Sequence, residues 1–310
     1  MNKKKVDVII PVYHPGKEFD RVIEKLTEQT YEINCIILLH TKDGQSLGYL
    51  KEKSKNIVIV DIEPEEFDHA ATRDKGIRMS EADIVICMTQ DACPDNENLI
   101  KELAESLEKE DVVVAYARQL PRKESTILEK YTRQFNYPPE SKIKSFEDLE
   151  KMGIKTYFCS DVCAAYNKDI YIRNGGFEKK AIFNEDMIYA AKAVRNGQKI
   201  YYNANARVVH SHNYSFAQQF HRNFDMAVSQ AQHPEVFEAV SSEKEGMKLI
   251  KNTVIYLLKK KRPLMIWKLF TDCVAKYSGY LLGKKYRKLP KKFILKCTMN
   301  PRYWTENIEI

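Results

Sequence analysis

The segment ADIVICMTQDACPDNE, residues 82–97, predicts a buried strand that runs out into a polar, acidic tip carrying Asp91. Residues 84–88 form a continuous apolar run of strand length, the pattern of a parallel strand covered on both faces. Ligands of open α/β sheets bind beyond the carboxyl ends of the strands, so the tip is a candidate site. The structural alternative is that Asp91 only starts a turn before Pro94 and that Asp95 caps the next helix.

Apolar, strand-like runs alternate with helical patterns on both sides of this segment. Further strands are expected at residues 6–13, 33–40, 57–62, 112–117, 157–166 and 199–212, and helices at residues 16–30, 68–78, 96–109 and 184–197. This alternation is typical of βαβ units and predicts an α/β fold with a parallel sheet. A dinucleotide-binding fold and a P-loop are disfavoured, because neither glycine motif is present. Residues 121–156, with Pro138 and Pro139, predict a less regular excursion.

The composition is that of a globular chain that can bury a sizeable core, since 44% of its 310 residues are hydrophobic. The length allows one large domain or two small ones. Seven cysteines are scattered without a C-x-x-C pair, which favours a reducing compartment and argues against a disulfide framework or structural zinc. The lysines at positions 3 to 5 make the N-terminus too charged for a signal peptide. No run approaches the roughly 18 apolar residues of a membrane span.

Positive charge is concentrated towards the C-terminus. Residues 244–302 contain 17 lysines and arginines but only two carboxylates, Glu245 and Asp272, whereas the whole chain carries a net charge of +7. The remainder is therefore net acidic, which indicates two parts with different roles. Residues 249–283 also show two helical apolar stripes that include Trp267. Such basic amphipathic helices suit an anionic membrane interface. The alternative is that the stripes pack on the rest of the chain or on a second subunit.

Three further groups of polar residues are candidates for a site. His69 and Arg73 are four residues apart at the start of a predicted helix, where two cations on one face would suit a phosphate group. A solvated surface turn is the alternative. Asp161 lies among apolar neighbours, where an unpaired carboxylate would be costly, so it is either a core hydrogen-bonding residue or a substrate ligand.

The acidic pair Glu185 and Asp186 opens a helix that Asn184 is expected to cap and Gly197 to end. The helix dipole alone favours acidic residues in this first turn. His210 and His212 alternate to the same face of a predicted strand end. Such a pair could ligate a divalent cation or bind phosphate, or both could be satisfied surface histidines.

Seven motifs resemble, in order and spacing, those of glycosyltransferase family 2, over about residues 5–225. They are Pro11-Val12-Tyr13, the turn Asp43-Gly44, the segment from His69 to Arg73, Thr89-Gln90-Asp91-Ala92, Gly175-Gly176-Phe177, Glu185-Asp186 and His210-Ser211-His212. The T-Q-D-A tip is similar to that of the bacterial rhamnosyltransferase branch, where it replaces the commoner D-x-D. The resemblance implies a GT-A fold, a Rossmann-like, mostly parallel sheet flanked by helices, here with a C-terminal basic helical extension.

The same resemblance implies a division of the chain into a GT-A catalytic domain, residues 1–225, and the basic amphipathic region, residues 226–310. Within the catalytic domain, about residues 1–120 would bind the nucleotide sugar and about residues 121–225 the acceptor. The extension would contact a membrane or a subunit.

It also implies a role for each matched residue. The nucleotide-diphosphate sugar donor would be bound by Pro11, Tyr13 and Asp43 at the base and ribose, by Arg73 at the diphosphate, and by His69, Gln90 and Asp91. Asp91 and His210 would ligate Mg²⁺ or Mn²⁺. Asp186 would be the general base, and Asp161, Glu185 and His212 would line the acceptor side.

We therefore expect an inverting, metal-dependent hexosyltransferase that moves L-rhamnose from dTDP-rhamnose to a lipid-linked or oligosaccharide acceptor in cell-surface polysaccharide synthesis. We expect it in the cytoplasm, peripheral on the inner face of the cell membrane, and its association into a homo-oligomer is left open. Nucleic acid is not an expected partner, because no nucleic-acid-binding motif accompanies the basic segment.

Two alternatives stay open. One is a transferase that uses another nucleotide sugar, such as a UDP-hexose. The other is a catalytically silent scaffold that binds nucleotide sugar, because Asp91 is the only carboxylate of the T-Q-D-A tip.

Overall fold

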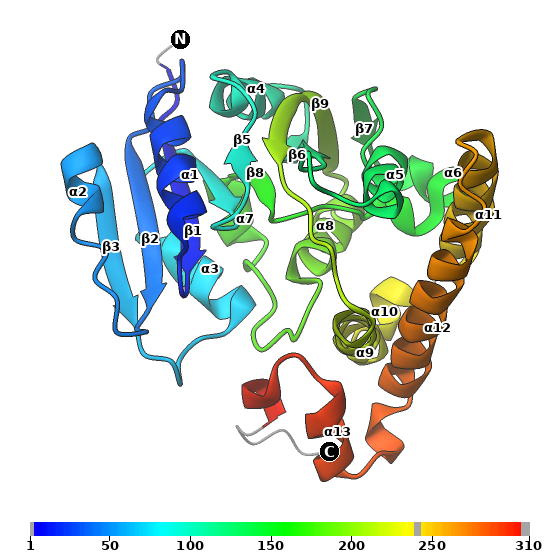
Figure 1. Cartoon of the computed structure of the whole chain (residues 1–310). Coiled ribbons are helices and arrows are strands. Elements are labelled where there is room, and N and C mark those ends of the chain that lie inside the picture. Colours follow the sequence, from blue (N-terminus) through cyan, green and yellow to red (C-terminus); the bar gives the residue numbers. More distant parts are fainter. Residues whose placement is uncertain (1–2, 239–242, 305–310) are drawn as a thin grey trace.

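The computed structural model describes residues 3–238 and 243–304 and places a nine-stranded sheet between layers of helices (Figure 1). The strands are β1 (Val6–Val12), β2 (Cys35–Thr41), β3 (Ile57–Ile62), β4 (Ile84–Met88), β5 (Cys93–Pro94), β6 (Val112–Leu120), β7 (Lys142–Lys144), β8 (Cys163–Asn167) and β9 (Lys199–Val209). Their order across the sheet is β3-β2-β1-β4-β8-β6-β9-β5, and β7 also pairs with β9.

Most strands of the sheet run in one direction. β1, β2, β3 and β4 pair in parallel, and β6 shares their direction because β8 is antiparallel to both β4 and β6. β9 is parallel to β6, whereas β5 and β7 run against it. The carboxyl ends of β1, β2, β3, β4, β6 and β9 therefore meet at one edge. The predicted α/β fold with a mostly parallel sheet is confirmed.

Two layers of helices cover the faces of the sheet. α1 (Lys17–Thr27), α2 (Leu50–Lys53) and α4 (Leu99–Ser106) pack on one face, where they meet Val8 and Ile10 of β1. α3 (His69–Met79) and α8 (Glu185–Arg195) pack on the other, where they meet Ile9. Successive strand residues point to opposite faces, so one strand supplies both cores.

Strand β4 has the environment that its sequence predicts. All five of its residues, Ile84–Met88, are buried, and it lies between β1 and β8. The chain leaves this strand at the common carboxyl edge and forms the tip, Thr89 to Asp91. Because β4 is buried in the middle of the sheet, the tip that follows it lies at the carboxyl edge.

Residues 121–156 are more regular than predicted. They contain α5 (Ile127–Asn136), β7, α6 (Leu149–Met152) and two 3-10 turns, Phe146–Asp148 and Gly153–Thr156. The expectation of an irregular excursion is wrong for α5, because Thr126 caps that helix by accepting a hydrogen bond from the Glu129 N–H. Next along the chain after β8, α7 (Lys168–Arg173) ends before Gly175 and Gly176, which both have positive φ, as expected for a glycine stop.

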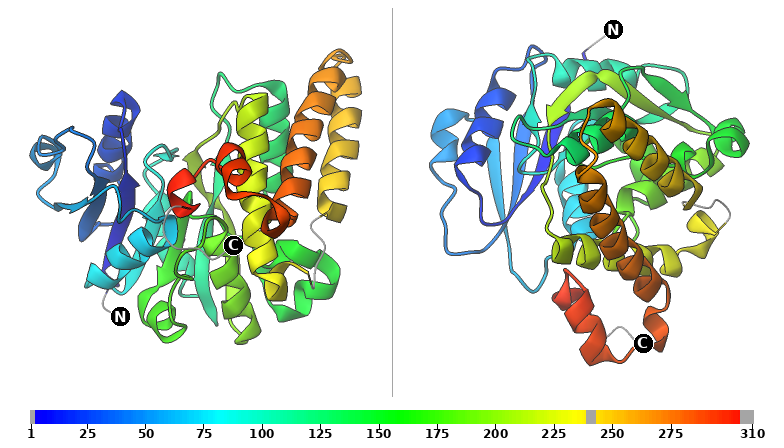
Figure 2. Two further views of the ribbon diagram at one scale, coloured as in Figure 1. Left: turned by 90° about the horizontal axis from the view of Figure 1, so that it is seen from below. Right: turned by 45° about the vertical axis from the view of Figure 1, so that its right-hand side comes forward.

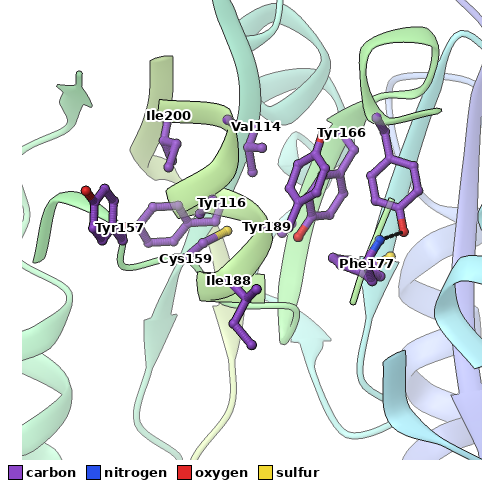
Figure 3. Close-up of a cluster of buried hydrophobic side chains, with 14 of the residues drawn as sticks. Val114, Tyr116, Tyr157, Cys159, Tyr166, Phe177, Ile188, Tyr189 and Ile200 are labelled. Atoms are coloured by element: carbon purple, nitrogen blue, oxygen red, sulfur yellow. Dashed lines mark hydrogen bonds between the residues drawn. The ribbon is translucent and has the colours of Figure 1, made fainter. Parts of the chain in front are cut away.

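An aromatic cluster lies beneath α8 and supports the site (Figure 3). Tyr166 packs against Phe177 and Tyr189, with ring centroids 5.5 and 5.6 Å apart. The Phe177 N–H donates to the Tyr171 hydroxyl at 2.8 Å. These rings fix the G-G-F segment and the start of α8 relative to β8.

The remaining helices are α9 (Phe216–Gln232), α10 (Pro234–Phe237), α11 (Glu243–Lys259), α12 (Met265–Lys284) and α13 (Lys291–Cys297), with 3-10 turns at Tyr286–Lys288 and Pro301–Trp304. α12 packs closely on α9, because a Cβ at Gly279 or Gly283 would lie 2.3 Å from a backbone carbonyl oxygen of α9. The expected domain boundary at residues 225 and 226 falls inside α9. Residues 239–242 and 305–310 of the expected extension lie outside the described residues. Among the helices described, none combines the length and the apolar character that crossing a membrane requires.

Candidate active site

A cavity of about 1400 Å³ opens at the carboxyl edge of the sheet. Five of the seven residues predicted on the donor side line it: Pro11, Tyr13, His69, Arg73 and Gln90. The other two, Asp43 and Asp91, lie in the turn after β2 and in the tip after β4. β1, β2 and β4 thus bring five of the predicted donor residues to one edge, and helix α3 supplies His69 and Arg73.

Gln90 joins the tip of β4 to the end of β1. Its side-chain oxygen accepts from the Tyr13 N–H at 2.8 Å, and its amide donates to the Tyr13 carbonyl at 2.9 Å. A carboxylate in this position could accept the first bond but could not donate the second. Gln90 therefore holds the backbone of Tyr13, a residue that is 45% exposed.

Asp43 is committed to bonds within the chain. One oxygen accepts from the His14 N–H at 2.7 Å and lies 3.3 Å from His14 Nδ1, and the other accepts from the Gln45 N–H at 2.9 Å and lies 3.2 Å from His40 Nε2. Burial acts to raise the pKa of Asp43, but the Gln45 and His14 N–H groups together with His40 outweigh it, and the pKa is lowered. Each carboxylate oxygen has two lone pairs, so these partners use the whole acceptor capacity. Asp43 holds the turn instead of presenting a free oxygen to a base.

Asp91, His210 and His212 converge at the tip. Asp91 Oδ2 lies 3.4 Å from His210 Nε2 and 3.2 Å from His212 Nε2, and the two imidazole nitrogens are 3.0 Å apart. Both histidines follow the end of β9, which ends at Val209 and not at residue 212 as predicted. His212, predicted on the acceptor side, belongs to this cluster, because its Nε2 atom contacts both His210 and Asp91. The proximity of Asp91 and His210 was predicted, and the structure shows it.

The surroundings set the charge of this cluster. Burial alone would raise the pKa of Asp91, but its hydrogen bonds to His210 and His212 outweigh burial and lower the pKa well below its ordinary value. Burial also lowers the pKa of His210. Gln119 of β6 contacts His210 Nδ1 at 3.1 Å and accepts from Arg133 of α5, which fixes the imidazole.

The three donor atoms fit a divalent cation. They lie within 4.8 Å of one another and comprise one carboxylate oxygen and two imidazole nitrogens. An ionised carboxylate and a histidine with a lowered pKa both offer the lone pairs that a cation needs.

Arg73 lies at the centre of a second cluster. Its side chain is buried, and Nη1 donates to Glu185 Oε1 at 3.0 Å and to the His69 carbonyl at 3.1 Å. Its Nε lies 3.7 Å from Asp161 Oδ2, and neither of these atoms has a hydrogen-bond partner in the described chain. The predicted contact of Arg73 with the diphosphate stays a prediction, because the guanidinium already links α3 to the start of α8.

His69 does not supply the second cation that its spacing predicts. It is half-buried beside Arg73, and burial together with this positive neighbour lowers the pKa of His69 to about 4. The imidazole is therefore neutral at neutral pH. The expected cation pair is wrong, because a spacing of four residues brings the ring close to a fixed positive charge.

Asp161 and Asp186 complete the second cluster. The Asp161 N–H donates to Asp186 Oδ2 at 3.1 Å, and the Met187 N–H donates to Asp186 Oδ1 at 2.7 Å. The Tyr166 hydroxyl of the aromatic cluster donates to Asp161 Oδ1 at 2.6 Å. Asn184 precedes α8 as expected, but its side chain makes no cap hydrogen bond.

This second cluster holds more carboxylates than cations. Burial raises the pKa of Asp161 to about 7, although Arg73 acts to lower it. The pKa of Asp186 is raised well above its ordinary value by burial and then by the charges of Glu185 and Asp161. A proton is therefore retained among these carboxylates near neutral pH.

The C-terminal segment is a part of the site that the sequence did not reveal. Residues 299–303 line the cavity, and seen from below they lie between α3 and α9 (Figure 2, left). Buried Asp225 of α9 accepts from the Thr298 hydroxyl at 2.6 Å and from the Met299 N–H at 2.8 Å. Arg302 donates to the Pro64 carbonyl at 2.9 Å on the other side. The only sequence signal is Trp304, a large apolar residue that the structure buries completely.

Comparison with known sequences places these residues in a family context. A model described as glycosyl transferase family 2 matches residues 7–175, more than half of the chain. The O-antigen chain rhamnosyltransferase RfbN of Salmonella typhimurium is 34% identical over 302 residues, which cover 97% of this chain and 96% of that protein. The O-antigen chain rhamnosyltransferase WbaN of Salmonella anatum is 34% identical over 303 residues, with coverages of 96% and 95%.

Solved structures share the fold. The mannosyltransferase PcManGT of Pyrobaculum calidifontis, in complex with GDP-Man and Mn²⁺, superposes with a TM-score of 0.62 at 14% identity, over 94% of this chain and 88% of that one. TarS of S. aureus, residues 1–349 with UDP-GlcNAc, superposes with a TM-score of 0.55 at 14% identity, over 92% of each chain. At such identities the likeness concerns the fold alone.

Proposed function

This chain belongs to glycosyltransferase family 2 and has the GT-A fold, and from that premise we propose that it transfers L-rhamnose from dTDP-β-L-rhamnose, with inversion, to a lipid-linked saccharide. Two relatives named as O-antigen chain rhamnosyltransferases, similar over nearly the whole chain, support the donor sugar and a role in cell-surface polysaccharide synthesis. The acceptor would be met at the inner face of the cell membrane.

The donor is proposed to occupy the cavity at the carboxyl edge. Pro11 and Tyr13 would contact the base and ribose from the end of β1, and Gln90 would hold that wall in place. Asp43 would act through the turn it stabilises and through the His14 N–H, and His69 as a neutral group. Residues 1–120 would thus carry most of the nucleotide contacts, with the segment 299–303 as a further wall.

Asp91, His210 and His212 would hold a divalent cation. When bound, the cation would neutralise the nucleoside diphosphate and make it a better leaving group. Two imidazoles beside one carboxylate suit Mn²⁺ better than Mg²⁺, which prefers oxygen ligands. The histidine pair adds two ligands to the single carboxylate of the tip, which supports the enzyme over the silent scaffold.

Asp186 is the proposed general base. An acceptor hydroxyl must lose its proton as it attacks the anomeric carbon. Asp186 would accept that proton in its ionised form, and its raised pKa makes this form a stronger base than an ordinary carboxylate. The Asp161 and Met187 N–H groups hold its two oxygens in a fixed orientation. Glu185 and Asp161 would line the acceptor side, where Arg73 balances part of their charge. A single displacement with one base inverts the anomeric centre and needs no covalent nucleophile.

The observation that carries the proposal is the presence of two unlike clusters at one edge of the sheet. One offers ligands for a cation beside the cavity, and the other offers a carboxylate able to accept a proton. Diphosphate departure and hydroxyl deprotonation need these two chemistries together.

A panel of dTDP-, UDP- and GDP-sugars, each with and without Mn²⁺, tests the donor by thermal shift. We expect dTDP-rhamnose with Mn²⁺ to raise the melting temperature most, because a ligand stabilises the folded state that binds it. A preference for a UDP-hexose would remove rhamnose but keep the transferase. Stabilisation without transfer would favour the silent scaffold, and no stabilisation by any nucleotide sugar would contradict the enzyme.

A further inference from the structure

Helix α12 presents an unpartnered apolar stripe to solvent. Its residues recur at intervals of three and four, and their exposed fractions are high: Trp267 72%, Phe270 56%, Val274 41%, Tyr277 61% and Leu281 40%. Intervals of three and four place side chains on one face of a helix. We call these five residues the α12 stripe.

The opposite side of α12 packs against α9 and holds the helix on the rest of the protein. Ala275, Gly279 and Gly283 are buried, and the two glycines allow the close contact with the backbone of α9. In the right-hand view of Figure 2, α12 lies at the front of the molecule with α9 behind it. The stripe therefore faces away from the core, and folding does not require its large aromatic side chains.

Positive charge lies at both ends of the α12 stripe. Residues 259–262, at the end of α11 and in the turn after it, are three lysines and an arginine, all exposed, and Leu264 after them is 90% exposed. Residues 284–288 at the other end contain four more cations. Asp272, the only carboxylate in the α12 sequence, is largely buried and paired with Lys268. The stripe is therefore an apolar and aromatic face between two basic groups.

We propose that this face binds the surface of an anionic membrane. Aromatic and aliphatic side chains would enter the interface between headgroups and acyl chains, and the basic groups at both ends would meet anionic headgroups. A second copy of the chain fits less well, although intervals of three and four also suit helix pairing. Pairing two such faces would bring the like charges of both basic groups together with no acid to compensate them.

The proposal deepens the proposed function, on which it rests for its purpose, because a lipid-linked acceptor lies at such a surface. It also explains why α12 is both fixed on α9 and apolar on its outer side. A helix that is held rigidly to the catalytic part would set the orientation of the whole molecule on the membrane.

Flotation of the full-length protein with vesicles tests the proposal. We expect binding to phosphatidylcholine vesicles that contain phosphatidylglycerol and little binding to phosphatidylcholine alone. Raising the salt from about 0.1 M to about 1 M shortens the Debye length from about 10 Å to about 3 Å and should weaken the binding.

The variant Trp267→Ser, Phe270→Ser, Tyr277→Ser should lose flotation, and so should Lys259→Glu, Lys260→Glu, Lys261→Glu. A matched control, Tyr49→Ser, Val58→Ser, Phe146→Ser, removes three residues that are 46%, 44% and 54% exposed elsewhere and should float like the wild type. Equal melting temperatures would show that all variants fold.

Undiminished flotation of either α12-region variant would overturn the proposal. Failure of the wild-type protein to bind vesicles that contain phosphatidylglycerol would also overturn it. Light scattering that shows a dimer, lost only in the aromatic variant, with no vesicle binding, would assign the face to a second copy. The donor thermal shift should be the same in wild type and both variants. If the nucleotide sugar does not raise the melting temperature, the proposed function is contradicted, but the conclusion about membrane binding from flotation still stands.

Discussion

Two clusters of side chains that include aspartates lie at the same edge of the sheet and differ in what surrounds these aspartates. At the tip of β4, one carboxylate meets two imidazoles, and the pKa of Asp91 falls well below its ordinary value. At the start of α8, Asp161 and Glu185 pair with the guanidinium of Arg73 and Asp186 lies beside them, and burial raises the pKa of Asp161 to about 7. The first stays ionised in acid, whereas the second keeps a proton near neutral pH.

The comparison shows how one residue type serves two chemical roles. Different surroundings give the carboxyl groups of one site different pKa values. A carboxyl group with a lowered pKa suits a cation ligand, and one with a raised pKa suits a proton acceptor. Asp91 is proposed as the first and Asp186 as the second. Variants of each cluster and of its supports can test this division.

The largest effect is expected from Asp186→Asn. An amide cannot take the acceptor proton, so transfer should fall by about 10²- to 10⁴-fold while donor binding persists. Initial rates and the donor thermal shift measure the two quantities. Asp169→Asn, an exposed carboxylate in the first turn of α7, is the matched control and should leave both unchanged. Loss of donor binding in Asp186→Asn would contradict its role as base.

Asp91→Asn should lower transfer by about 100-fold at a fixed Mn²⁺ concentration, because the site loses its only anionic ligand. Unlike Asp186→Asn, it should also lose the part of the donor thermal shift that depends on Mn²⁺. Nearby Asp95, which pairs with Arg207 at 2.9 Å, provides Asp95→Asn as a control. An unchanged Mn²⁺ dependence in Asp91→Asn would show that the tip does not hold the cation.

Gln90→Leu should raise the KM for the donor by about tenfold with a smaller change in kcat. Two hydrogen bonds to the Tyr13 backbone are lost, each contributing about 1 kcal/mol. Gln90→Glu keeps an acceptor for the Tyr13 N–H and should lie between wild type and Gln90→Leu. Equal values for the two variants would show that holding Tyr13 is not what Gln90 contributes.

Asp225→Ala should raise the KM for the donor by about fivefold or less, because the segment 299–303 loses its attachment to α9. Asp225→Asn should behave like wild type, since its oxygen can accept from the Met299 N–H and its amide can donate to the Thr298 hydroxyl. The KM for the acceptor should not move in either variant. An equal rise in both KM values would indicate a general structural defect instead of a changed donor wall.

The smallest effect concerns stability and pH. Folding raises the pKa of Asp161 from 3.8 to about 7, so its contribution to stability is full below 3.8 and is lost as the pH rises through about 7. Asp161→Asn removes that loss. The melting temperature of the variant minus that of wild type should therefore increase by about 2 °C between about pH 5 and pH 8. A difference that does not change with pH would contradict the raised pKa.

The layout of the sheet and much of the site could be predicted from the sequence. Buried strands need apolar residues, so the apolar runs predicted the positions of β1, β2, β3 and β4. Because ligands of such sheets bind beyond the carboxyl ends of the strands, Asp91 and His210 were expected at one edge, where they lie. What the sequence could not predict depends on burial and on contacts that only the folded chain makes. The charge of His69 depends on its burial beside Arg73, and the Asp43 carboxylate is bonded to the His14 N–H, 29 residues away.

The C-terminal part shows the same limit on a larger scale. Its helical stripes were predicted, but the close contact of α12 with α9 was not. That contact depends on Gly279 and Gly283, which leave room for the backbone carbonyls of Phe220 and Phe224. No local pattern predicts that residues 299–303 reach the cavity at the carboxyl edge. Tertiary packing decides that, through Asp225 and Trp304.

The wall formed by residues 299–303 has a consequence for the order in which the protein becomes competent. The ribosome releases this segment after every other part of the cavity, so a nascent chain can assemble its sheet and both aspartate clusters while the cavity still lacks one side. A polypeptide interrupted after α12 would carry the proposed base and cation ligands but would hold nucleotide sugar weakly.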